Sequence, residues 1–280
     1  MQPIIRMVLS TSLVLSFNLI ATASDNAAVF KDSKLEENVR KFIGGAEPGK
    51  PLTQDQLNHV YLVSASSQPI SDLAGLENCP NLNTIYLTGS QVSDLTPLSK
   101  LTNLEQLTIL GAKVRDLTPL AGLTHLRYLN LSLNQISDLS PLANLKDLQT
   151  LNLTGNAIAQ LGPLQGLTSL QSLYLDANQV SDLKPLAGLK ALQTLSIKQN
   201  RVADLSPLTS LTAWRGLYLD QNQVTDLTPL VTMVQPDRQP SKGLTPFWIV
   251  SLRGNPLSAQ ARSRDLPALQ KRAFDVIVDR

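Results

Sequence analysis

The sequence of 280 residues offers two sets of side chains whose types and spacing could support chemistry: two histidines and a regular series of aspartates. His59 and His125 would suit a metal site or an acid–base pair if they lay together. They occupy the same position of a repeating unit, three units apart. Stacking at ~4.8 Å per unit would separate them by about 15 Å. We therefore expect both imidazoles at the surface, with no shared site.

The aspartates recur at multiples of the same spacing, which raises the question of bound calcium. They are Asp72, Asp94, Asp116, Asp138, Asp182, Asp204 and Asp226. An Asp before Leu-x-Pro caps a tight turn, and no unit supplies the several oxygens that Ca²⁺ needs. Phosphate-binding loops and nucleophile motifs are absent as well. The sequence thus predicts no metal, no cofactor and no enzyme.

Composition narrows the partner classes. The net charge is +2, without the basic stripe that neutralises phosphates, so we expect no nucleic acid. Aromatic residues make up only 4% of the chain, so most burial must come from aliphatic side chains. The single cysteine, Cys79, allows no internal disulfide and stands where other units place Leu. We interpret it as a small buried hydrophobe.

The N-terminus resembles a secretory signal. Arg6 precedes an apolar stretch from Met7 to Ile20, and Ala21–Ala23 offers a small-x-small cleavage pattern. An uncleaved membrane anchor is the alternative, but the apolar stretch is shorter than the ~20 residues that span a bilayer. We predict a secreted, periplasmic or extracellular protein with no stable membrane insertion after the signal is removed.

A 22-residue repeat, LxxLxxLxLxxNxIxDLxPLxx, organises most of the chain. Its copies begin at Leu57, Cys79, Leu101, Leu123, Leu145, Leu167, Leu189 and Leu211. One unit cannot bury its own Leu and Ile side chains, so the units must stack, with neighbouring strands in parallel. The pattern predicts an α/β repeat solenoid: a right-handed leucine-rich-repeat superhelix with a parallel concave sheet, short 3-10 or extended convex segments and a helical N-cap.

Two columns of the repeat carry a structural explanation. An Asn column follows each strand, where stacked amides can satisfy buried backbone groups from layer to layer. It comprises Asn134, Asn156, Asn178, Asn200, Asn222 and Asn255, and it is replaced in the earliest units by Gln68, Ser90 and Ala112. We expect the N-terminal end of this ladder to be less well satisfied. The prolines of Asp-Leu-x-Pro-Leu favour a short 3-10 turn.

The stack needs caps, which sets the predicted domains. They are a signal peptide at 1–23, a helical cap at 24–56, eight repeats at 57–232, a ninth repeat with an 11-residue insertion at 233–257, and a C-terminal cap at 258–280. Ser33 to Glu36 has capping-box spacing, with Leu35, Val39 and Phe42 on one helical face. A short helix and a strand from Phe274 to Val278 are expected at the other end. The insertion, 234–246, is either a binding loop or neutral drift.

Outward residues of the predicted strands form the candidate partner-binding face. They are Tyr86, Thr108, Tyr128, Asn130, Asn152, Tyr174, Asp176, Lys198, Tyr218, Asp220 and Arg253. Four of the five tyrosines lie here, and Tyr61 lies beside them. Tyr is favoured at interfaces, although it is also a good strand former. We predict a contact patch centred on Tyr174, Asp176, Lys198, Tyr218 and Asp220.

The repeat resembles the bacterial, internalin-like leucine-rich-repeat class. So do the N-terminal stretch FKDSKLEENVRKFIGG…PLTQDQLNHVYLVSASSQPISDLAGLE and the closing GNPLSAQARSRDLPALQKRAFDV, which together extend the resemblance over about residues 30 to 278. Proteins of this class bind other proteins through the concave sheet. The resemblance therefore implies a protein partner, whose identity the repeats do not reveal.

Two other functions stay open. An intracellular enzyme-regulating scaffold would apply if the N-terminal segment is not cleaved. A glycan- or cell-wall-binding surface would use exposed aromatics, and Trp214 and Trp248 lie near the start of strands. Trp214 occupies a core Leu column, so we expect it to be buried. We expect the protein to be a monomer.

Overall fold

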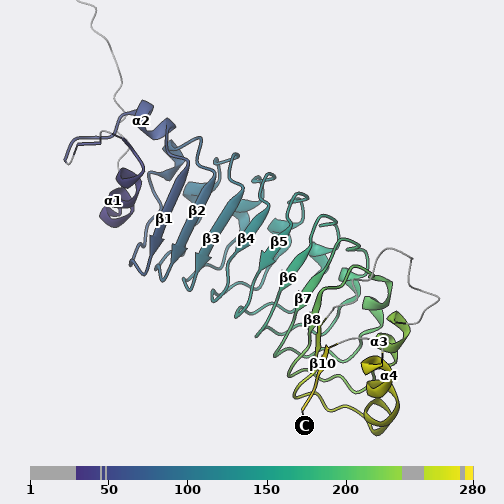
Figure 1. The fold of residues 1–280 in the computed structure, drawn as a ribbon. Helices are drawn as coiled ribbons and strands as arrows, with labels where there is room; N and C mark the ends of the chain where they lie inside the picture. The colour runs from purple at the N-terminus through teal and green to yellow at the C-terminus, as the bar shows by residue number, and fades with distance from the viewer. Residues whose placement is uncertain (1–29, 45, 48, 235–248, 272–274, 280) are drawn as a thin grey trace, which may run out of the picture.

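The computed structural model describes residues 30–44, 46–47, 49–234, 249–271 and 275–279. The predicted signal peptide, most of the predicted insertion and Trp248 lie outside these ranges. Figure 1 shows an elongated stack in which the strands follow one another in chain order from the purple end to the yellow end. The described ends of the chain lie at opposite ends of the stack.

One parallel sheet of ten strands runs the length of the described chain. The strands are β1 (Leu62–Ser66), β2 (Thr84–Thr88), β3 (Gln106–Leu110), β4 (Tyr128–Asn130), β5 (Thr150–Asn152), β6 (Ser172–Tyr174), β7 (Thr194–Ser196), β8 (Gly216–Tyr218), β9 (Ile249–Ser251) and β10 (Asp275–Ile277). Tyr218 of β8 pairs with Ser251 of β9, which is the register that the 11-residue insertion predicts. The predicted leucine-rich-repeat solenoid is confirmed.

Short 3-10 helices return the chain to the next strand. They are η1 (Leu76–Asn78), η2 (Thr96–Leu98), η3 (Thr118–Leu120), η4 (Ser140–Leu142), η5 (Gly162–Leu164), η6 (Lys184–Leu186) and η7 (Ser206–Ser210). Proline stands in the first turn of η2 to η7, where it needs no N–H partner and fixes φ. After β8 the same position begins an α-helix instead, α3 (Thr228–Met233).

The core between strands and return turns is almost wholly aliphatic. The Leu, Ile and Val columns of successive layers are buried in one continuous cluster. Trp214 and Cys79 are buried in it, as predicted. Burial raises the pKa of the Cys79 thiol to about 12, so this thiol stays protonated and unreactive in the folded protein.

The Asn column binds each layer to the one before it. Asn178 Nδ2 donates to the carbonyls of Leu153 (3.0 Å) and Leu175 (3.0 Å), and its Oδ1 accepts from the N–H of Ile158 (2.9 Å). The other members repeat this pattern: Asn134, Asn156, Asn200, Asn222 and Asn255. The predicted ladder is confirmed.

The N-terminal end of the ladder is satisfied differently. The oxygen Oε1 of Gln68 accepts from Nδ2 of Asn38, a buried residue of the first helix, at 2.6 Å. In the next layer the buried Oγ of Ser90 has no hydrogen-bond partner among the described residues. The expected weakness of the early ladder is therefore confirmed at Ser90, whereas a helix side chain compensates at Gln68.

A column of left-handed residues stands between each strand and its Asn turn. It comprises Ser67, Gly89, Gly111, Leu133, Gly155, Ala177, Gln199, Gln221 and Gly254, all with φ between 53° and 69°. Their N–H groups, up to that of Gln221, donate to a carbonyl of the next layer. Each layer thus keeps this backbone bond to its successor, and the non-glycine members tolerate the steric cost of left-handed φ.

The N-terminal cap consists of two helices, α1 (Ser33–Lys41) and α2 (Gln54–Asn58). The expected helix at Ser33 is confirmed, but its capping box is not: Asp32 is the N-cap, and it accepts from the N–H groups of Lys34 and Leu35. The capping box belongs to α2, between Thr53 and Gln56. Phe42 was predicted on the same helical face as Leu35 and Val39, but α1 ends at Lys41, and Phe42 is exposed whereas the other two are buried.

At the other end, a π-helical turn (Ala261–Asp265) leads into α4 (Leu266–Gln270), and β10 follows as the last strand. The predicted helix and strand are both present here. α3 and α4 pack together at this end, and α4 contacts β10. None of the helices in the described part of the chain has the length and hydropathy needed to cross a bilayer.

Candidate functional site

The predicted outward column lies in one register row across the sheet. Strand pairing links Ser64, Tyr86, Thr108, Asn130, Asn152, Tyr174, Ser196, Tyr218 and Ser251 in that order. Tyr128 lies at the start of its strand, in the neighbouring row. The 22-residue spacing thus brings side chains that are far apart in the sequence onto one face.

Exposure differs along this face. Tyr86 and Tyr128 are exposed, and Tyr174 and Tyr218 are half-buried. Thr108 is only 5% exposed, because the longer Tyr86 and Asn130 flank it in the adjacent strands. Thr108 therefore has little surface to offer a partner, although it points outward as expected.

The two asparagines of the row, Asn130 and Asn152, accept hydrogen bonds from residues in the turns that follow them. The Oδ1 atom of Asn130 accepts from the N–H (3.1 Å) and the hydroxyl (2.7 Å) of Ser132, and Asn152 Oδ1 accepts from the N–H of Thr154 (3.0 Å). These bonds orient both amides, so each contributes a fixed polar group to the centre of the sheet.

A groove of about 500 Å³ lies at the carboxyl ends of the last strands. It is lined by Asp176, Lys198, Gln199, Asp220, Gln221, Arg253, Gly254 and Asp279. Four of these residues were predicted as contact residues: Asp176, Lys198, Asp220 and Arg253. The others were missed, and only the register of β9 with β10, which places Asp279 beside Arg253, could have identified the aspartate.

The carboxylates of the groove also connect adjacent layers. Asp176 Oδ1 accepts from Ser196 Oγ (2.6 Å) and from the Lys198 N–H (2.8 Å). Asp220 Oδ1 makes the equivalent bonds to Ser251 Oγ (2.5 Å) and to the Arg253 N–H (2.9 Å). Both carboxylates are thereby held in place before any partner arrives.

One exposed leucine lies in the left-handed column that follows the strands. Leu133 is 58% exposed and adopts the left-handed conformation, with Gly111 and Gly155 at its position in the adjacent layers. Its side chain lies over Gly155, where an added Cβ would be 2.6 Å from Leu133 Cδ2. An exposed apolar side chain on strained backbone is a candidate contact residue that the repeat pattern did not reveal.

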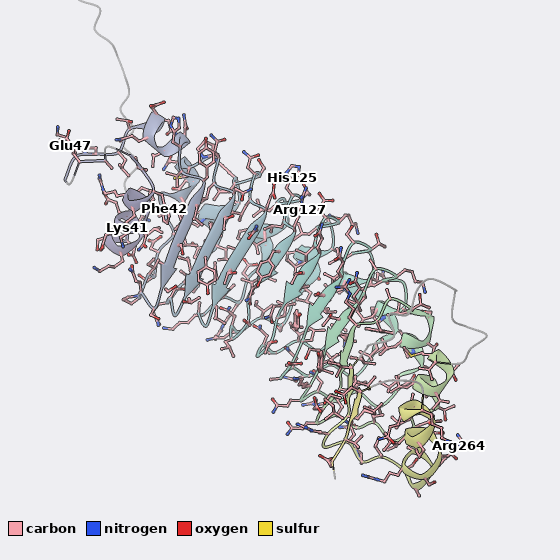
Figure 2. All side chains as sticks on the ribbon, viewed as in Figure 1. Lys41, Phe42, Glu47, His125, Arg127 and Arg264 are labelled. Carbon is pink, nitrogen blue, oxygen red and sulfur yellow. The ribbon has the colours of Figure 1, made fainter. Side chains whose placement is uncertain are left out.

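The residues first considered for chemistry have structural roles. His59 and His125 are exposed and far apart in the stack, and each ring Nδ1 lies within hydrogen-bond distance of a backbone carbonyl. Figure 2 shows His125 with Arg127 at the edge of the sheet where the strands begin. A shallow hollow of about 420 Å³ next to His125 is lined by Tyr61, Asn81, Asn83, Asn103 and Glu105.

The aspartate column caps the return turns, as predicted. In each case Oδ1 accepts the N–H two residues on, at 2.8–2.9 Å, for Asp72, Asp94, Asp116, Asp138, Asp182, Asp204 and Asp226. Hydrogen bonds from the hydroxyl and the N–H of Thr228 hold the pKa of Asp226 below 3.8. The described residues contain no group of three or more His, Cys, Asp or Glu that could hold a metal ion.

Comparison with known proteins finds a matching family model and solved structures that share this architecture. A family model described as leucine rich repeats (2 copies) matches residues 124–166, 146–188 and 190–232. Internalin C2 of Listeria monocytogenes is 29% identical over 90% of this chain and 95% of its own, with a TM-score of 0.62. No curated protein sequence matches the chain.

Two further solved structures share the fold. A leucine-rich-repeat protein of Leptospira interrogans is 25% identical over 75% of this chain and 52% of its own, with a TM-score of 0.64. The functional domain of InlJ from Listeria monocytogenes, which includes a cysteine ladder, is 23% identical over 86% of this chain and 54% of its own, with a TM-score of 0.65. This chain spans about half the length of these two structures.

Proposed function

Because the chain is a bacterial internalin-like leucine-rich-repeat protein, we propose that it is an exported module that binds a protein partner on the outward face of its sheet. It acts by recognition and not by catalysis. One observation carries the proposal: in the last layers, the strand register places Tyr174 and Tyr218 in the row next to the charged side chains that line one groove.

The patch has the chemistry of a protein interface. Tyr174 and Tyr218 offer large side chains with a polar tip and little rotamer entropy to lose. Asp176 and Asp220 are held by hydrogen bonds, which lowers the cost of ordering them on binding. Arg253 is exposed at the end of the groove, where it can contribute an anchor of the kind that recurs at interfaces.

A glycan-binding surface has less support from the described residues. Sugar-binding surfaces commonly present exposed aromatic rings, and Trp214 is buried in the core. The aromatic rings next to the groove are those of Tyr174 and Tyr218, which are half-buried, and the groove itself is lined mainly by charged side chains. This pattern favours a polypeptide.

Affinity capture tests the proposed function. Purified protein is immobilised and compared with the Tyr174→Ala/Tyr218→Ala variant and with Tyr61→Ala, a matched exposed tyrosine at the far end of the stack. We expect a protein that the wild type and Tyr61→Ala retain and that the double variant loses by at least tenfold in affinity. Equal retention by all three would refute the patch, and retention of a polysaccharide but no protein would refute the partner class.

Export, domain limits and the monomeric state belong to the same proposal. Cleavage after Ala23 would give a mature chain beginning at Ser24, with a helical cap to residue 56 and repeats from Leu57. Mass spectrometry of the protein recovered outside the cytoplasm tests this directly. An intact N-terminus on protein confined to the cytoplasm would instead favour an intracellular scaffold.

A further inference from the structure

Five charged residues of alternating sign form one row across the last five layers of the sheet. The strand register aligns Tyr174, Ser196, Tyr218, Ser251 and Ile277. Two residues further along each layer stand Asp176, Lys198, Asp220, Arg253 and Asp279, which we call the charge row. All five line the groove described above.

Within the described chain, the members of the charge row form no ion pairs with one another. The ion pairs found among the described residues lie in the N-terminal cap and beside α4, and none joins two members of the row. Among the described residues, the hydrogen bonds to the carboxylates of Asp176 and Asp220 use only Oδ1, and those to Asp279 use only Oδ2. Each carboxylate is therefore fixed by one oxygen and keeps the other for a ligand.

A second alternation runs beside the charge row. Half-buried Tyr174 and Tyr218 alternate with buried Ser196 and Ser251, so large and small side chains follow each other from layer to layer. In each of these four layers the residue two positions further along the sequence is an Asp where the strand carries Tyr, and a Lys or Arg where it carries Ser. The surface thus repeats every two layers, which is a distance of about 9.6 Å at ~4.8 Å per strand.

The spacing of the row discriminates between the two regular forms of a polypeptide. Four steps across the sheet cover about 19 Å. Four turns of an α-helix cover about 22 Å, a difference that long side chains can absorb. Same-face residues of an extended strand lie about 6.7 Å apart, so four steps cover about 27 Å and fall out of register with the row.

We propose that the partner presents an α-helix that lies across β6 to β10 and carries charges of alternating sign on successive turns, complementary to the charge row. This inference rests on the proposed function and specifies the partner element. Basic side chains of the helix face Asp176, Asp220 and Asp279, and acidic side chains face Lys198 and Arg253. Opposed signs in this order also select one register of the helix, since a shift by one turn places like charges together.

Synthetic helices test the charge order. The first probe is a staple-locked, Ala-rich helix of about 20 residues, long enough for five turns, with Lys, Glu, Lys, Glu and Lys on successive turns of one face. The second has the same composition in the order Lys, Lys, Lys, Glu, Glu. The third is the first without its staple and with a central proline, which breaks the helix. Calorimetry at low ionic strength should show the first binding at least tenfold more tightly than the other two.

A protein variant ties the binding to the row. Lys198→Glu/Arg253→Glu gives all five positions the same sign. Neither side chain donates a hydrogen bond to another described residue, so the fold should be retained. Lys113→Glu/Lys271→Glu changes the net charge equally at exposed positions away from the groove. The first double variant should abolish the preference between the probes, and the second should leave it.

The outcomes separate the two levels of the proposal. Equal affinity for the first two probes, or unchanged affinity for the proline probe, would overturn the helical partner. The helical partner would also be overturned if none of the helical probes binds and a polysaccharide binds the wild type but not Lys198→Glu/Arg253→Glu. A captured protein that is lost with the tyrosine variant but unaffected by Lys198→Glu/Arg253→Glu keeps the proposed function and removes only the helix.

Discussion

The ammonium Nζ of Lys198 lies 5.1 Å from the centroid of the Tyr218 ring. The same ring lies over Gly216 of its own strand, where an added Cβ would be 2.8 Å from Tyr218 Cε2. The Tyr218 ring therefore contacts both a cation and a strand position without a Cβ, and two residues of the proposed patch are in direct contact.

The first prediction concerns this pair. Because a cation over an aromatic face at a partly exposed site contributes roughly 0.5–1 kcal/mol, Lys198→Met should lower the free energy of unfolding by about that amount. The effect should vanish in a Tyr218→Leu background. A double-mutant cycle from urea unfolding measures the coupling, and a coupling energy near zero would show that the contact adds nothing to stability.

The Asn ladder gives a larger effect. Asn178→Ala leaves the N–H of Ile158 without its partner and removes one of the two amide bonds to each of the carbonyls of Leu153 and Leu175. A buried orphan group costs about 1–3 kcal/mol. We expect the free energy of unfolding to fall by at least roughly 2 kcal/mol in urea titrations followed by circular dichroism. Asn144→Ala, at an exposed position, is the matched control and should change it by less than about 0.5 kcal/mol. Similar losses from both would contradict the ladder's role.

Substitutions in the left-handed column should change the free energy of unfolding in opposite directions. Ala177→Gly should raise the free energy of unfolding by up to about 1 kcal/mol, because glycine removes the Cβ conflict at φ 53°. Gly111→Ala should lower it, and Gly155→Ala should lower it further, since only the latter brings a new Cβ against Leu133. Thermal unfolding of the three variants gives the order, and a more stable Gly155→Ala protein would show that the column is not strained.

Low pH should weaken the return turns. The hydrogen bonds from Thr228 lower the folded-state pKa of Asp226 below its ordinary value of 3.8. A depressed carboxyl pKa stabilises the folded state above the unfolded-state pKa, and that contribution disappears as pH falls through the folded-state value. Melting temperatures should therefore be level from pH 7 to about pH 5 and fall below about pH 4.

A variant tests whether the Asp226 carboxyl causes this pH dependence. Asp226→Asn should show a shallower decline below about pH 4 than the wild type, because its side chain cannot be protonated in that range. Asp147→Asn, at an exposed position outside the aspartate column, should follow the wild-type profile. Identical slopes for all three proteins would mean that the turn aspartates do not contribute.

The periodic parts of the molecule could be predicted from the sequence, and the non-periodic parts could not. The 22-residue spacing determines which residues share a row, so even the pairing of Tyr218 with Ser251 across the insertion was predicted. The N-cap at Asp32 depends on local backbone geometry that Ser33 could equally have provided. The small exposure of Thr108 depends on neighbours in other layers.

The charged groove shows the same division. Asp176 and Asp220 were predicted as outward residues, but their bonds to Ser196 and Ser251 arise only when layers are stacked in register. Leu133 was missed because the repeat pattern leaves its position unspecified, and its exposure follows from the glycines beside it. The strand pairing and the Asn ladder repeat with the 22-residue spacing and follow from it, whereas the individual side-chain contacts of the groove require the three-dimensional stack.

The Asn ladder has a direction, and that direction matches the direction of protein synthesis. Each Asn bonds backbone groups of the preceding layer, so a layer is complete only when its successor has been made. As the ribosome extends the chain from its N-terminus, every new repeat finishes the one before it. The growing molecule therefore always has one open layer at its leading end. In the finished protein Asn255 closes the layer of Val224, and Asp279 accepts the N–H of Gly254 beyond it.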